Sequence, residues 1–242
     1  METKVTPPQP GPVTPPSQPP AVPWTPREVW FGLALLVLWL VLALACALVV
    51  GLLELGWDTG LLVTLLEGLL LVPVWWLTVR KHKVGLGALG LRRFPFVMLV
   101  LAFGLMLVAY TFNFLHALVL LLLGVRPSMD LVSLVSQLEH PWLFFLGGVV
   151  VAPLAEEVFF RGFVFAGLRG RYGWVKAALI SSALFSLMHL QLTQFLPLFL
   201  IGFFLALLYE KSRSLWPAVA MHAAINAIGL AAAYWYTRLG GV

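Results

Sequence analysis

Three short stretches of this chain carry polar side chains whose types and spacing could hydrolyse an amide bond. They are Glu156-Glu157-x-x-x-Arg161, Phe185-x-x-x-His189 and His222-x-x-x-Asn226. Residues four apart lie on one face of a helix, so each stretch presents its outer side chains together. A buried carboxylate with a histidine can activate water, while a second histidine and an asparagine amide can donate hydrogen bonds to an oxyanion. The same Glu and two His could instead hold zinc with one position open, and the spacing does not choose between these chemistries.

The first stretch lies inside an apolar run, residues 142 to 168, that is long enough to cross a bilayer. Charge is costly there, so an ionisable residue in such a run indicates a functional site. Glu157 and Arg161 are separated by about 40° around a helix and are expected to form an ion pair. Glu156 is turned away by about 100° and can face a cavity. Pro153 removes one backbone hydrogen bond, which favours a kink that opens space beside the carboxylates.

The three stretches are predicted to meet at one depth. At 1.5 Å per residue, Glu156 lies ~18 Å and His189 ~22 Å from the inner ends of their apolar runs. His222 and Asn226 lie ~10 to 17 Å from the corresponding end of theirs. One polar cluster built from three helices is therefore the most economical interpretation.

The composition identifies the class of protein. Of the 242 residues, 61% are hydrophobic and only 10% are charged, whereas a soluble domain carries about 25% charged residues. We therefore expect an all-α, polytopic transmembrane bundle, formed as a single domain by residues 27 to 242. About seven membrane helices are predicted, at residues 29–53, 60–79, 95–123, 142–168, 174–191, 193–209 and 215–236. No internal repeat of the kind common in secondary transporters is found.

The ends of the apolar runs predict the topology. Twelve lysines and arginines fall on one side if the helices alternate, and only Arg126 and Arg238 fall on the other. The positive-inside rule then places the amino terminus in the cytoplasm and the carboxyl terminus on the opposite side of the cell membrane. Residues 1 to 26 hold ten of the seventeen prolines and are predicted to form a disordered cytoplasmic tail. The net charge of +5 is explained by topology, so nucleic acid is not expected as a partner.

The order and intervals of the three motifs resemble those of the CPBP intramembrane protease family, the CAAX-protease and bacteriocin-processing group also called Abi. The motif core covers residues 142 to 230, and Leu86-Gly-Ala-Leu-Gly-Leu-Arg92 resembles the Gly-Leu-Arg segment that often precedes it. The resemblance implies an intramembrane endopeptidase that acts on a membrane-associated protein or peptide, either prenylated and CAAX-like or bacteriocin-like.

The resemblance also implies roles for the motif residues. Glu156 and His189 would activate the water, and His222 and Asn226 would stabilise the oxyanion. Three further residues would support them: Glu157, Arg161 and Phe185. No cofactor is required by this scheme. If the enzyme uses zinc, its ligands would be Glu156, His189 and His222.

Two other functions fit the same residues. In a non-enzymatic membrane scaffold, or an immunity or regulatory partner, the polar cluster would only hold the helices together. In a proton-coupled transporter, buried Glu and His residues would form a relay. The transporter is disfavoured because the charged groups gather at one depth and do not form a path across the membrane.

Overall fold

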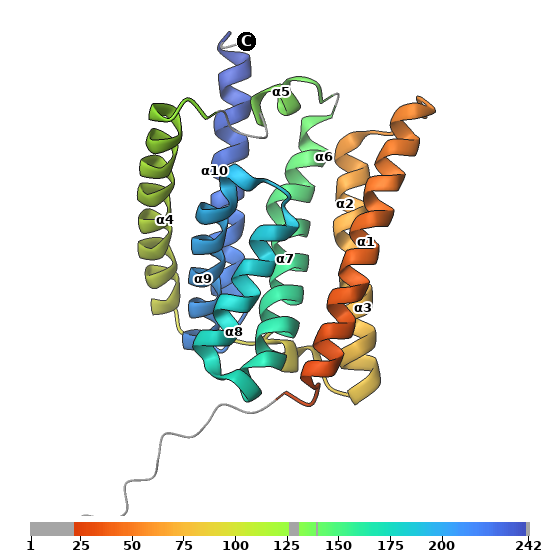
Figure 1. Cartoon of the computed structure of the whole chain (residues 1–242), viewed down its shortest axis with the longest axis vertical. Coiled ribbons are helices and arrows are strands. Elements are labelled where there is room, and N and C mark those ends of the chain that lie inside the picture. The colour runs from red at the N-terminus through yellow and green to blue at the C-terminus, as the bar shows by residue number, and fades with distance from the viewer. Residues whose placement is uncertain (1–21, 126–130, 139, 241–242) are drawn as a thin grey trace, which may run out of the picture.

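The computed structural model describes residues 22–125, 131–138 and 140–240, and these residues form a bundle of helices (Figure 1). The predicted all-α fold is therefore confirmed. The long helices are α1 (Pro26–Leu52), α4 (Val97–Leu122), α8 (Ala166–Met188), α9 (Phe195–Ser212) and α10 (Trp216–Arg238). The shorter segments are α2 (Thr59–Leu69), α3 (Leu71–Trp75), η1 (Trp76–Arg80), η2 (Leu86–Leu89), α5 (Leu131–Ser136), α6 (Pro141–Leu146), η3 (Gly147–Val151), α7 (Ala152–Glu157), η4 (Val158–Phe165) and η5 (Leu192–Gln194).

Within the described residues, six helical runs are long and apolar enough to cross a membrane. The fourth, Pro141–Met188, has 48 residues and folds back on itself at Gly173, whose φ of 77° and ψ of 162° are not helical. Such a positive φ is accessible to glycine without a steric penalty. The two arms pack against each other, so this run supplies both predicted helices 142–168 and 174–191, and about seven segments match the prediction. The second arm ends at Met188, three residues earlier than expected.

The predicted helix 60–79 is interrupted in the structure. It is divided into α2, α3 and the π-helical turn η1. Pro73 explains the first break, because it has no N–H to donate to the carbonyl of Leu69, and α2 ends at Leu69. The structure still has one helical run from Thr59 to Arg80, which confirms the predicted helix 60–79. The breaks within it were not predicted, because the mean hydropathy of an apolar run does not report a missing backbone donor.

The first helix begins with local signals and is anchored by a tryptophan. Thr25 and Glu28 form a capping box, and Pro26 occupies the first turn. Trp24 is only 2% exposed, and its indole Nε1 donates a 3.0 Å hydrogen bond to the carbonyl of Phe163. Residues 22 to 26, predicted as part of the disordered tail, therefore belong to the packed structure, and Pro26 is the first residue of α1. Residues 1–21 of that tail lie outside the described residues.

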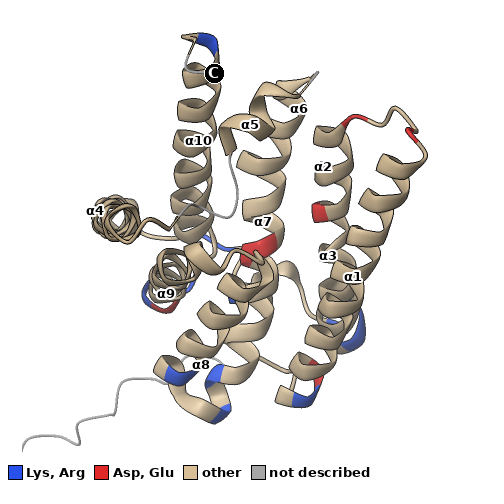
Figure 2. Cartoon of the chain, turned by 45° about the horizontal axis from the view of Figure 1, so that its top comes forward, with Lys and Arg blue, Asp and Glu red and all other residues tan. Residues whose placement is uncertain are grey.

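The core lies around the segment that carries the first motif. Four phenylalanines of η4 are fully buried and make edge contacts with neighbouring rings: Phe159, Phe160, Phe163 and Phe165. Lysines and arginines gather at the end of the bundle where α1 and the second arm of α8 begin, while acidic residues of α2 and α7 lie between the two ends (Figure 2). The clustering agrees with the predicted charge asymmetry. Which side of the membrane this end faces stays a prediction.

Candidate active site

The segment that carries Glu156 and Glu157 is a short α-helical turn between two π-helical turns. η3 precedes α7 and η4 follows it. In η3 the N–H of Ala152 donates to Gly147, five residues back, instead of to Gly148. Pro153, five residues after Gly148, has no N–H, so the Gly148 carbonyl lacks a helical donor. The side-chain amide of Asn226 supplies one at 2.8 Å. The proline thus creates the acceptor that attaches α10 to this helix.

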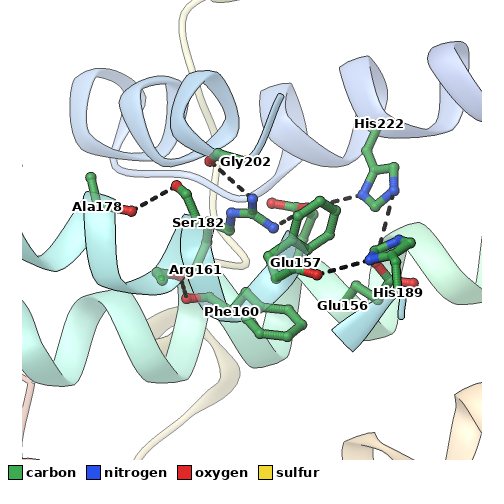
Figure 3. A network of polar contacts seen from close by, with 11 residues as sticks. Glu156, Glu157, Phe160, Arg161, Ala178, Ser182, His189, Gly202 and His222 are labelled. Carbon is green, nitrogen blue, oxygen red and sulfur yellow. Dashed lines mark hydrogen bonds and ion pairs between the residues drawn. The ribbon is translucent and has the colours of Figure 1, made fainter. Parts of the chain in front are cut away.

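Glu157 is the centre of a buried network. Its Oε1 accepts a 2.8 Å hydrogen bond from Nη1 of Arg161 and lies 3.0 Å from Nδ1 of His222 (Figure 3). Nη2 of Arg161 donates to the carbonyl of Gly202 at 2.9 Å. Both members of the ion pair are 0% exposed. The network joins α7, η4, α9 and α10, and the ion pair predicted from the four-residue spacing is confirmed.

Glu156 stands next to this network but outside it. Its side chain is 9% exposed, and among the described residues its Oε2 has no hydrogen-bond partner. The nearest basic group recorded for it is Nε2 of His222, 3.9 Å from Oε2, which is too long for a hydrogen bond. A buried carboxylate oxygen without a partner is costly. Its environment therefore suits a group that interacts with a substrate or a reacting water.

His189 is oriented by the end of its own helix. The backbone N–H of His189 donates to the carbonyl oxygens of Ser186 and Leu187 instead of to that of Phe185, four residues back. The helix α8 therefore ends here, and the Phe185 carbonyl lacks its helical donor. Nδ1 of the His189 ring lies 2.8 Å from the Phe185 carbonyl. Because a carbonyl can only accept, Nδ1 carries the proton and Nε2 of the neutral ring is free to accept one. This is the tautomer that a general base requires.

The Phe185 ring occupies the centre of the cluster. It lies 4.8 Å from the ring of His189 and 5.6 Å from that of His222, centre to centre, in edge contacts. The guanidinium carbon of Arg161 lies 4.5 Å from the centre of the same Phe185 ring, in a cation–π arrangement. The structure thus brings the motifs of α7, α8 and α10 together around one aromatic side chain. Asn226 of α10 lies beside η3, and its side-chain amide donates one hydrogen bond to the Gly148 carbonyl.

The zinc alternative requires three ligands in one group. Among the described residues, no three His, Cys, Asp or Glu side chains are grouped so that they could hold a metal ion. In the described structure Glu156, His189 and His222 are therefore not grouped as the ligands of one metal ion, and we derive no step through a metal.

Two residues of the site were missed by sequence reasoning. Gly202 exposes its carbonyl to Arg161, and a Cβ there would lie 3.1 Å from the Cα of Ser182 and 3.3 Å from Nη2 of Arg161. Glu67 of α2 has a buried Oε2 that lacks a hydrogen-bond partner among the described residues, and its charge interacts with that of Glu156. An acidic residue within an apolar run was the available signal for Glu67. A glycine within another run gave no comparable signal for Gly202.

The fold and site define a multi-pass membrane protein with a buried cluster of Glu, His and Arg side chains in its core. Residues 138–228 match the family model described as type II CAAX prenyl endopeptidase Rce1-like. This match covers all three motifs and confirms the family resemblance predicted from them.

Two curated relatives are similar over part of the chain. "Putative membrane peptidase YdiL" of Bacillus subtilis (strain 168) is 28% identical over 101 residues, 42% of this chain and 41% of the relative. "UPF0177 protein YxdF" of Lactococcus lactis subsp. lactis (strain IL1403) is 30% identical over 81 residues, 33% of this chain and 44% of the relative. The matched region thus spans about two fifths of the length of these relatives. No solved structure matches the chain.

Proposed function

We propose that this protein is an intramembrane endopeptidase that hydrolyses a peptide bond of a membrane-associated protein or peptide. The observation that carries the proposal is the buried Oε2 of Glu156, which has no hydrogen-bond partner among the described residues and lies 3.9 Å from Nε2 of His222. A buried carboxylate oxygen without a partner is available to accept a hydrogen bond from a reacting water. The family match and the relative named as a membrane peptidase support the same class of reaction.

The residues divide the reaction between them. Glu156 accepts one proton of the water as the water oxygen bonds to the carbonyl carbon of the substrate, while Nε2 of His189 accepts a hydrogen bond from the same water and orients it. The oxyanion that forms accepts hydrogen bonds from the second amide proton of Asn226 and from Nε2–H of His222 when that ring carries both protons. The C–N bond then breaks, and the leaving nitrogen takes the proton from the base. Glu157 holds the His222 ring through Nδ1 and is itself held by Arg161.

A purely structural role accounts for part of the cluster only. Glu157, Arg161 and His222 join helices and would stabilise a scaffold as well as an enzyme. Glu156 adds no hydrogen bond through Oε2 within the described structure, and its burial costs free energy. A scaffold has no use for such a group, whereas a hydrolase does.

Cleavage of a quenched membrane-peptide library by the purified full chain tests the proposal. The library contains the same peptides with and without a C-terminal prenyl group, because both CAAX-like and bacteriocin-like substrates are proposed. Glu156→Gln and His189→Ala are expected to lose cleavage by about a hundredfold or more. Glu54→Gln, at an exposed carboxylate, is the matched control and should retain the full rate. Equal rates for Glu156→Gln and the control would refute the proposed base.

A further inference from the structure

A cavity of about 790 Å³ lies at the end of the bundle where lysines and arginines gather (Figure 2). Four arginines line it: Arg92, Arg169, Arg171 and Arg213. They come from the segment before α4, from α8 and from the residue after α9. Arginines far apart in the sequence therefore converge on one concave surface, which the positive-inside rule does not require, because it concerns only which side of the membrane a charge occupies.

These arginines are only partly neutralised. Glu210 pairs with Arg169 at 2.6 Å and with Arg213 at 3.1 Å. Among the described residues, neither Arg92 nor Arg171 forms an ion pair with a carboxylate. Arg92 lies beside the hydroxyl of Tyr209. The guanidinium carbon of Arg171 lies 5.9 Å from the centre of the Tyr172 ring. Desolvation lowers the pKa of Arg213, and the positive charges of Arg169 and Arg92 lower it further, while Glu210 raises it. The guanidinium groups of Arg92, Arg169 and Arg213 are thus close enough to repel one another, and an anion between them would relieve the repulsion.

Apart from Thr25, the remaining lining residues are apolar or aromatic. Val22, Ala166 and Trp174 are among them. Trp174 is 37% exposed, as is common for tryptophan at the boundary between lipid and water. It also begins the second arm of α8, whose positive helix end favours an anion. A compact anionic group attached to an apolar molecule fits both parts of this lining.

We propose that this cavity binds the phosphate of an anionic phospholipid headgroup, with its arginines as donors and its apolar wall against the glycerol and upper acyl region. Arginine presents several N–H donors in a fixed geometry that matches phosphate oxygens. Basic cavities between transmembrane helices are a known mode of lipid recognition. The proposal is independent of the peptidase activity, because none of these residues belongs to the Glu156 cluster.

Native mass spectrometry of the purified full chain tests the lipid site. The protein is titrated with phosphatidylglycerol or with phosphatidylcholine, and retained lipid is counted. The wild type is expected to retain phosphatidylglycerol in preference. Arg92→Gln/Arg171→Gln should lower that retention by about tenfold or more. Arg93→Gln/Lys176→Gln removes the same charge from exposed positions outside the cavity and is the matched control, expected to retain the lipid.

Three results would overturn the proposal. Equal loss in the cavity variant and its control would show that only the general charge of this end attracts lipid. Equal retention of phosphatidylcholine would show that the headgroup charge is not recognised. Displacement of the lipid by millimolar glycerol 3-phosphate would show that the cavity binds a free phosphate compound. If Arg92→Gln/Arg171→Gln unfolds, Arg92→Lys/Arg171→Lys keeps the charge but not the planar donors, and reduced retention there still supports recognition by arginine.

Discussion

The neighbouring carboxylates Glu156 and Glu157 of the candidate active site are expected to respond in opposite ways to the same substitution. Glu157 accepts hydrogen bonds within a network that includes the fully buried Arg161. Glu156 has an Oε2 without a hydrogen-bond partner in the described structure. We predict that Glu157→Gln lowers the melting temperature of the protein. Glu156→Gln should leave the melting temperature nearly unchanged but abolish cleavage.

The magnitudes follow from what each change leaves behind. Glu157→Gln leaves the Arg161 guanidinium buried without its counter-charge, which costs about 3–5 kcal/mol. At about 2–4 °C per kcal/mol for a chain of this size, the melting temperature should fall by roughly 6–20 °C. Glu156→Gln removes a buried charge that pairs with nothing at Oε2, so its effect on the free energy of unfolding should stay below about 1 kcal/mol. Its cleavage rate should fall about a hundredfold or more.

Thermal unfolding in detergent, followed by tryptophan fluorescence, measures the first quantity, and the quenched-peptide assay measures the second. Glu157→Gln/Arg161→Met removes both partners and should recover part of the stability lost in Glu157→Gln, because no uncompensated charge remains. A melting temperature for Glu156→Gln as low as that for Glu157→Gln would refute the division into one structural and one chemical carboxylate. Wild-type stability of Glu157→Gln would refute the importance of the ion pair.

Three further predictions concern other parts of the site. Gly202→Ala should lower stability by about 1–3 kcal/mol, because the added Cβ would lie 3.1 Å from Ser182 and 3.3 Å from Arg161; an unchanged melting temperature would show that α9 shifts at no cost. Glu67→Gln should leave the melting temperature equal or higher, since it removes a buried carboxylate oxygen that lacks a partner in the described residues; a lower melting temperature would mean that Glu67 is a structural acceptor. Cleavage should persist in the presence of a zinc chelator, because Glu156, His189 and His222 are not grouped as metal ligands; loss of cleavage that added zinc restores would require a rearranged, metal-binding site.

The sequence was informative where the physics is local. The ion pair of Glu157 with Arg161 depends only on the helical repeat, and the structure has it at 2.8 Å. Helix ends were predicted to within a few residues because apolar length and end signals determine them. The break near Pro73 was missed, although its cause, an absent backbone N–H, is also local.

The contacts between helices were decided by tertiary structure alone. The sequence determined that this is a membrane protein with its polar groups at particular positions, because bilayer thickness and helical periodicity act on each segment separately. It could not show that Nδ1 of His222 faces Glu157, that Asn226 bonds to Gly148, or that arginines from distant segments line one cavity. Those contacts depend on how helices that are remote in sequence pack against one another. Side-chain spacing predicted that the three motifs lie at one depth, but it does not determine which atoms of neighbouring helices meet.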